Sequence, residues 1–282
     1  MNFKNQMAGK LFFWAAAATC IVTIAVLGFM AILSLPVITK GFFLDLLTGS
    51  WAPYYGRFGI LPMIAGSFYI SFLSLAVSLP LSLGCSFFIT LIQPGIPGRI
   101  LKKLIELMTA IPTVIYGFVG IFLLVPLVRN IFAYGSGMCV LSASIMLGLV
   151  ISPTMILFFI QSIDTVPKTY LNAVDALGGT VSQKIAHIII PNAWPGMLTG
   201  IILAFGRAMG DTMIALMISG NSVGFAHNVL DSARTLTAHI ALTIAADFDS
   251  IEFKIIFICG TCLYFLTGFG VILARFADKS HS

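Results

Sequence analysis

The sequence predicts an all-α, polytopic membrane protein with about six transmembrane helices. Hydrophobic residues make up 59% of the 282 positions, charged residues make up 9%, and the mean hydropathy is +1.05. About a quarter of the residues in a soluble domain are charged, so this composition is typical of a chain that lies mostly in lipid. A helix needs about 20 apolar residues to cross the bilayer core, and the chain offers about six such stretches.

Short segments that carry most of the charges separate the predicted spans. The first span is far longer than a signal-peptide core, so we expect it to remain as a membrane anchor. The second is longer than a perpendicular crossing needs, which predicts a tilt or a break near Pro80. Six spans place both termini on one side of the membrane, and residues 1–282 are predicted to form one domain. The spans are residues 11–35, 60–91, 107–132, 137–163, 195–220 and 255–274.

The basic residues predict that both termini are cytoplasmic, because cytoplasmic loops collect Lys and Arg. In this orientation the net charge of +5 reflects the bias toward the inside and requires no nucleic-acid partner. The inner set is Lys4, Lys10, Arg99, Lys102, Lys103, Lys168, Lys184, Arg275 and Lys279, and the outer set is Lys40, Arg57, Arg129, Arg234 and Lys254.

The sequence predicts neither an enzyme nor a metal site. Cys259-Gly-Thr-Cys262 has the spacing of a redox pair, but it lies within an apolar run and lacks a second ligand pair, so helix packing is the favoured role. The four histidines lack metal-ligand spacing. No nucleotide-binding glycine loop appears, so we expect no cofactor bound by this chain and no ATP hydrolysis by it alone.

A patterned segment between the fourth and fifth spans is more informative. Asn172-Ala-Val-Asp-Ala-Leu-Gly178 is followed by Ile188-Ile-Ile-Pro191. The pattern resembles the cytoplasmic loop of bacterial ABC importer permeases, where Glu-Ala-Ala, a glycine and Ile-x-Leu-Pro shape a short helix that docks on the ATPase subunit. Asn172 replaces the usual Glu, and Ile190 replaces the usual Leu.

This resemblance implies the fold of a type I ABC importer permease. The core would cover about residues 58–275, and a cytoplasmic ATPase-docking loop would cover about residues 164–194. The residues that it assigns to docking are Asn172, Ala173, Asp175, Gly178 and Pro191.

Two ionisable side chains lie within the fifth predicted span. At about 1.5 Å per residue, Arg207 lies roughly 18 Å along a helix from Pro195, near the middle of that span. Inserting a charge there costs about 2.5–3.5 kcal/mol, so Arg207 and Asp211 are expected to face protein or a water-filled cavity. Four residues apart, they are expected to share one helix face and to approach each other.

Two interpretations of this pair are open. In the first, a buried ion pair would fix helix packing. However, a pair with Arg N-terminal to the acid is weaker than the reverse order, and replacing a buried ion pair with apolar residues is often neutral or stabilising. Alternatively, a guanidinium that forks onto two oxygens is suited to phosphate, and the carboxylate holds it until the anion arrives. We favour the second interpretation, a transient anion site in a translocation path.

The segment around Arg207 is similar to that of phosphate-specific permeases, and most like their PstC-type subunit. The family pattern is Arg-Ala-x-Gly-Glu-Thr-Met followed by Gly-Asn. Thr212 and Asn221 keep the pattern, whereas Asp211 replaces Glu. Residues 58–66, 111–117 and 234–241 support the same subunit. The resemblance implies that Arg207, Asp211 and Thr212 line the substrate pathway.

Thr113 and Tyr116 are weaker pathway candidates. They follow Ile111-Pro112, where the proline breaks a helix. Such a break either exposes backbone groups to a pathway or kinks a packed helix. The sequence leaves both possibilities open.

The resemblance implies a permease subunit of an ATP-driven phosphate importer in the bacterial inner membrane. Its implied partners are a second permease of the PstA type, two ATPase subunits that bind ATP and Mg, membrane lipid and a periplasmic or extracellular phosphate-binding protein. Arg207 alone does not neutralise a phosphate dianion, so the partner permease is expected to supply a second cation. The alternatives are a permease for another oxyanion, such as sulfate or molybdate, and an ion-coupled carrier with Asp211 as proton relay.

Overall fold

A computed structural model describes residues 3–39, 46 and 48–279, and helices dominate it. Within these residues, six segments are long and apolar enough to cross a membrane, which confirms the predicted all-α polytopic class. The segments are Gly9–Leu35, Leu61–Ile92, Thr113–Phe132, Val140–Asp164, Val181–Gly210 and Ile251–Phe269.

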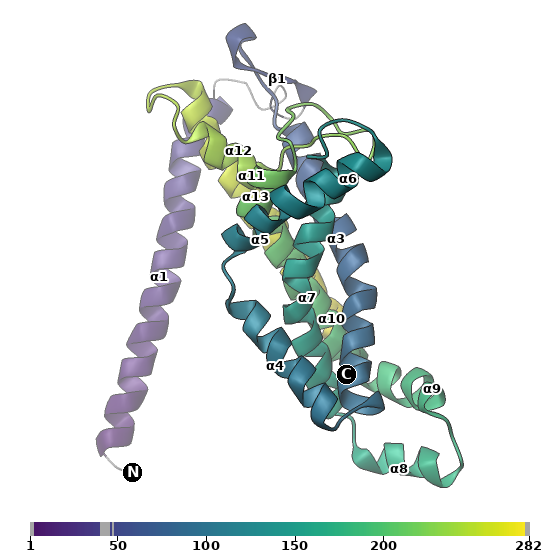
Figure 1. The fold of residues 1–282 in the computed structure, drawn as a ribbon. Helices are drawn as coiled ribbons and strands as arrows, with labels where there is room; N and C mark the ends of the chain where they lie inside the picture. Colours follow the sequence, from purple (N-terminus) through teal and green to yellow (C-terminus); the bar gives the residue numbers. More distant parts are fainter. Residues whose placement is uncertain (1–2, 40–45, 47, 280–282) are drawn as a thin grey trace.

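The first helix, α1 (Phe3–Thr39), diverges from the bundle toward its N-terminus (Figure 1). It contacts α13 (Ile251–Lys279), where the absence of a side chain at Gly260 makes room for Met30. Trp14 is 69% exposed, and its apolar neighbours on α1 are exposed to a similar degree. An apolar helix exposed on this scale is suited to lipid contact.

The centre of the bundle is the pair α3 (Leu61–Phe87) and α7 (Val140–Asp164). A stripe of buried serines on α3 lets the two helices approach closely, as small residues do in membrane proteins. Ser78 Oγ lies 3.1 Å from Ser152 Oγ, and a Cβ at Gly148 would lie 3.0 Å from the Ser74 carbonyl oxygen. The stripe is Ser67, Ser71, Ser74, Ser78, Ser82 and Ser86.

Helix α3 runs through Pro80 without the break that was one of the two expectations for this span. Its irregularity comes later, where Phe88–Ile92 form a π-helical turn. The chain then turns into α4 (Ile96–Ala110). A proline inside a transmembrane helix is tolerated because neighbouring groups satisfy the freed carbonyl.

The third span begins at Thr113, so the expected range of residues 107–132 was wrong at its start. Helix α4 ends at Ala110, and Ile111 is extended with ψ 126°. The residue before a proline is driven out of the helical region, which explains the break. The chain resumes as α5 (Thr113–Val119), a π-helical turn (Gly120–Leu124) and α6 (Val125–Phe132).

The fifth span was predicted at residues 195–220, and this range was wrong. The helix starts with α9 (Val181–Gln183), continues through a π-helical segment (Lys184–Ile189) and ends with α10 (Ile190–Gly210). Asp211 is extended with ψ 125°, and a separate short helix, α11 (Met213–Ile218), follows. Pro191 directly follows the π-helical segment, and neighbouring groups can satisfy the carbonyl that a proline frees inside a transmembrane helix, so it does not delay the helix.

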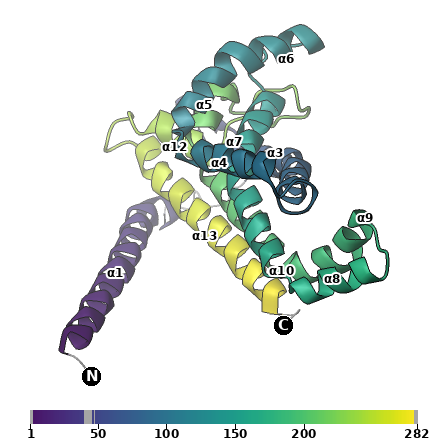
Figure 2. The same cartoon turned by 60° about the horizontal axis from the view of Figure 1, so that its bottom comes forward.

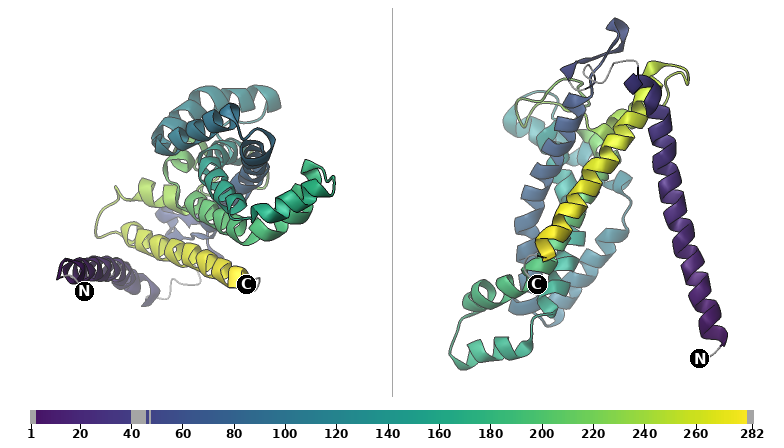
Figure 3. Two further views of the ribbon diagram at one scale, coloured as in Figure 1. Left: turned by 90° about the horizontal axis from the view of Figure 1, so that it is seen from below. Right: turned by 180° about the vertical axis from the view of Figure 1, so that it is seen from behind.

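One end of the bundle carries a small hairpin and α12 (Leu236–Thr243). In the hairpin, β1 (Trp51–Ala52) pairs antiparallel with β2 (Arg57–Phe58) across the turn η1 (Pro53–Tyr55). The opposite end carries α8 (Lys168–Ala176) and α9, which project from the bundle (Figure 2). Both chain ends lie toward the α8 end (Figure 3), as an even number of spans requires.

We predict that Gly148→Leu destabilises the protein by about 1–3 kcal/mol, because the new side chain would push α7 away from Ser74 and Val77 on α3. The measurement is the thermal unfolding midpoint in detergent. Gly84→Leu is the matched control, because a Cβ at Gly84 meets no atom within 4 Å. Equal shifts for both variants would contradict close α3–α7 packing.

Candidate functional site

Two helix breaks lie close together in the bundle. One is at Ile111 and Pro112 before α5, and the other is at Asp211 and Thr212 before α11. Helices α5 and α11 pack directly on each other, because a Cβ at Gly117 would lie only 2.5 Å from Met217 Sδ. The polar groups freed at the two breaks therefore belong to one region of the protein.

At the first break, the Tyr116 hydroxyl donates a hydrogen bond to the Met108 carbonyl (3.2 Å). That carbonyl is in the last turn of α4, where it also accepts a long hydrogen bond from the Ile111 N–H (3.4 Å). The backbone N–H of Ile115 donates to the Pro112 carbonyl (3.0 Å), which starts α5. Tyr116 thus braces the kink, and Thr113 is the first residue of the restarted helix.

At the second break, the Asp211 side chain caps α11. Its Oδ1 accepts a hydrogen bond from the Ile214 N–H (2.9 Å), and the Asp211 carbonyl accepts one from Thr237 Oγ1 (2.9 Å). The carbonyl of Thr212 accepts the first backbone bond of the new helix, from Leu216 (2.9 Å). An Asp in this role satisfies an N–H that the start of a helix leaves unpaired.

The expectation that Arg207 and Asp211 share a helix face was therefore wrong, because α10 ends at Gly210. Arg207 is in the last turn of α10 and has its side chain exposed in this chain. Its Nη1 donates to Thr154 Oγ1 on α7 (2.7 Å), and it lies within electrostatic range of Tyr116 and Asp211. Within the described residues it forms no salt bridge. Since guanidinium has five N–H donors, most remain available to an anion.

Near the hairpin, Arg234 supports the turn that contains Asn221. Arg234 Nε donates to the Asn221 carbonyl (3.0 Å), and Ser219 Oγ donates to the Ala233 carbonyl (2.7 Å). Asn221 has a φ of 56°, which asparagine tolerates better than most residues. Burial, and to a lesser extent Arg234, lowers the pKa of the neighbouring His239 to about 4. That histidine is therefore neutral at pH 7, and Arg234 provides the positive charge of this cluster.

The cysteines show no paired chemistry in the part of the chain that the structure describes. All five are free. Cys259 is fully buried in the cluster that includes Ile255 and Met63, in agreement with a packing role. Residues 3–39, 46 and 48–279 contain no group of His, Cys, Asp and Glu that could hold a metal ion.

The projecting loop brings four of the five predicted docking residues together. Asn172, Ala173 and Asp175 lie exposed on α8, and Gly178 ends the following turn with a φ of 73° that glycine adopts without strain. Thr180 and Gln183 then form a capping box that starts α9. The fifth docking residue, Pro191, lies in the first turn of α10.

An ion pair joins the two arms of this loop. Lys184 Nζ lies 2.5 Å from Asp175 Oδ1. The lysine side chain is only 17% exposed, whereas the aspartate is 57% exposed. The pair therefore holds α8 against the start of the fifth span.

Comparison with known proteins identifies the family. A family model described as "Binding-protein-dependent transport system inner membrane component" matches residues 78–277. The chain belongs to this family.

Individual proteins that are similar to this chain support the family match. The chain is 31% identical to the probable ABC transporter permease protein YqgH of Bacillus subtilis strain 168, over 79% of this chain and 72% of the relative. It is 30% identical to the probable phosphate transport system permease protein PstC of Methanocaldococcus jannaschii, over 78% of this chain and 76% of the relative. An inward-facing structure of the MetNI methionine ABC transporter has a TM-score of 0.60 at 14% identity, covering 79% of this chain and 94% of that one, and supports the fold.

The sequence did not reveal several residues of the candidate site. Thr154 contacts Arg207 from α7, and no local motif marks it. Thr237 contacts Asp211 from within residues 234–241, a stretch that supported the resemblance without indicating this contact. Lys184 was assigned only to the inner charge set, although it braces the docking loop. Leu177 is 88% exposed, and an apolar residue between the projecting helices was a detectable sign of a partner surface.

Asp211→Asn and Asp211→Ala should separate capping from charge. Asparagine keeps an oxygen for the Ile214 N–H, whereas alanine loses the cap, which costs about 1 kcal/mol. We therefore expect Asp211→Ala to lower the unfolding midpoint more than Asp211→Asn does. Equal destabilisation by the two variants would show that the negative charge, rather than the cap, stabilises the break.

Charge reversal tests the brace in the docking loop. Asp175→Lys and Lys184→Asp should each reduce ATP-driven transport several-fold in assembled complexes, and the double variant should recover at least half of the loss. Because the Asp175 side chain is largely exposed to solvent, the pair contributes about 1 kcal/mol or less, and folding should change little. A double variant no better than either single variant would mean that Asp175 acts through another contact.

Proposed function

We propose that this chain is a permease subunit of an ATP-driven phosphate importer, and that Arg207 contacts the passing anion. The contacts and exposure of the Arg207 side chain are the main support for this proposal. A neutral hydroxyl, that of Thr154, holds its guanidinium beside a helix break, and the side chain is exposed in the single chain. A guanidinium held in this way keeps its charge and a fork of donors for oxyanion oxygens. The similarity to permeases named PstC supports phosphate as the oxyanion.

The proposed site binds weakly, because a pathway has to release what it admits. Asp211 lowers the net positive charge near Arg207, while its side chain is engaged in the cap of α11. A carboxylate with that structural role is poorly suited to act as a proton relay, which argues against the ion-coupled carrier. A second permease, of the PstA type, supplies the further cation that a phosphate dianion needs.

In the proposed cycle, both termini and the α8–α9 loop are on the cytoplasmic side of a bacterial inner membrane. A periplasmic or extracellular binding protein delivers phosphate to the outer mouth, near the hairpin and α12. Two partner ATPase subunits bind ATP and Mg and move α8 as they close. Because Lys184 and Asp175 join α8 to the fifth span, this movement reaches α10 and opens the pathway alternately to the two sides.

The test is uptake of labelled phosphate by phosphate-starved cells that lack this gene and any redundant importer. The wild-type chain should restore uptake, whereas Arg207→Gln should abolish it at equal membrane abundance and complex assembly. Arg99→Gln makes the same change at an exposed position of α4, away from the proposed pathway and outer mouth, and is the matched control. Asp211→Glu should be tolerated, since it restores the usual family residue.

Competition with sulfate and molybdate during the same uptake tests the anion. Of the three unlabelled anions, only phosphate should reduce the uptake of labelled phosphate. If deletion leaves phosphate uptake unchanged while sulfate or molybdate uptake falls, the phosphate assignment fails. If Arg207→Gln prevents assembly, a packing role replaces the proposed contact with the anion.

A further inference from the structure

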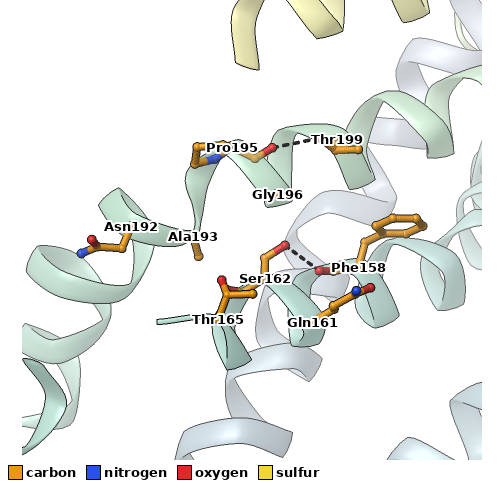
Figure 4. Close-up of a pocket in the computed structure, with 9 residues that line it drawn as sticks. All are labelled: Phe158, Gln161, Ser162, Thr165, Asn192, Ala193, Pro195, Gly196 and Thr199. Carbon is orange, nitrogen blue, oxygen red and sulfur yellow. Dashed lines mark hydrogen bonds between the residues drawn. The ribbon is translucent and has the colours of Figure 1, made fainter. Parts of the chain in front are cut away.

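A groove of about 350 Å³ opens between α7 and α10, in the half of the bundle nearest α8 (Figure 4). Gln161 and Ser162 line it from α7, Thr165 lines it from the position directly after α7, and Asn192 and Thr199 line it from α10. None of its lining residues is charged. A groove of this size has room for several waters, or for a small oxyanion with part of its hydration shell.

The groove continues the same helix faces that hold Arg207 and Thr154. Residues that recur every three or four positions share one face of a helix. At about 1.5 Å per residue, Thr199 lies roughly 12 Å along α10 from Arg207. On α10 this face is Asn192, Gly196, Thr199, Leu203 and Arg207. On α7 it is Thr154, Phe158 and Gln161, and Thr165 continues it at the C-cap.

The hydrogen bond from Arg207 to Thr154 joins the two faces at one end, and the groove joins them at the other. Phe158 and Leu203 lie between these polar regions. Leu203 is 40% exposed, so the stretch between them is open on the α10 side rather than sealed in the core. An anion leaving Arg207 would therefore pass a short apolar stretch before it reaches the next polar groups.

Polar side chains in the groove can bond a ligand, but they already have hydrogen-bond partners without one. The Ser162 hydroxyl donates to the Phe158 carbonyl (2.7 Å) and the Thr199 hydroxyl donates to the Pro195 carbonyl (3.1 Å). The Asn192 amide likewise donates to the Ile188 carbonyl (2.6 Å). Because each group has a partner on its own helix, hydrogen bonds to a passing ion would be exchanged at little net cost or gain. No cation retains an anion there, and no carboxylate repels it.

We propose that this groove is a release station, a weak hydrated site for the oxyanion after it leaves Arg207 and before it enters the cytoplasm. The proposal rests on the proposed import function and adds the second half of the pathway within this chain. The occupant is the transported tetrahedral oxyanion with its water.

The first test measures water access with a membrane-impermeant, sulfonate-bearing methanethiosulfonate reagent. Assembled complexes in inside-out vesicles carry either Thr199→Cys or Trp194→Cys, and the wild-type chain gives the background of the native cysteines. Trp194 lies on the opposite face of α10 and is 43% exposed. The reagent should label Thr199→Cys at least ten-fold faster than Trp194→Cys. A Thr199→Cys that reacts no faster than Trp194→Cys would overturn the proposal and indicate that a partner subunit covers the groove.

The second test places a negative charge in the groove. Gln161→Glu is nearly isosteric and should reduce uptake at least ten-fold, because its carboxylate repels the anion. Gln93→Glu makes the same change at an exposed residue in the turn before α4 and should transport at the wild-type rate. Equal uptake by the two variants, with equal assembly, would overturn the proposal.

The two tests separate this proposal from the proposed function. Cysteine labelling does not depend on which anion is carried. If the phosphate assignment fails but Thr199→Cys is labelled fast, the groove remains a release station for another oxyanion. Gln161→Glu would then have to reduce uptake of that oxyanion. Normal phosphate import with slow labelling of Thr199→Cys would reject the release station and leave the proposed import function standing.

Discussion

The candidate site depends on one constraint: backbone N–H and C=O groups need hydrogen-bond partners wherever water is scarce. This chain interrupts two of its spans, before α5 and before α11, and each interruption frees such groups. Tyr116 bonds a carbonyl at the first, whereas Asp211 and Thr237 complete the second. With these bonds made, α10 ends next to the polar region and presents Arg207 on its last turn.

The rest of the fold holds this region in place. Buried serines and Gly148 bring α3 and α7 into close contact, and α7 in turn presents Thr154 to Arg207. The fifth span connects the candidate site to the docking loop, because its first turns are tied to α8 through Lys184 and Asp175. A push on α8 therefore acts on the same helix that carries Arg207.

Sequence reasoning predicted the composition-driven features well. Runs of apolar residues located the first, second, fourth and sixth spans, because length and hydropathy decide whether a helix crosses a bilayer. The fifth span was predicted to start too late, because the resemblance assigned residues 164–194 to the docking loop. The helix already begins at Val181 and includes a π-helical segment. The bonds to Thr154 and Thr237 join segments distant in sequence, so only the fold reveals them.

The role of Arg207 is tested most directly by the amount of phosphate moved per ATP hydrolysed, in proteoliposomes that contain this chain, its partner subunits and the loaded binding protein. We expect Arg207→Gln to keep the ATP hydrolysis that the binding protein stimulates but to move almost no phosphate. Arg207 would then act on the anion, while α8 still couples to the ATPases. A proportional loss of hydrolysis and transport, with the ratio unchanged, would contradict this role and assign Arg207 to coupling.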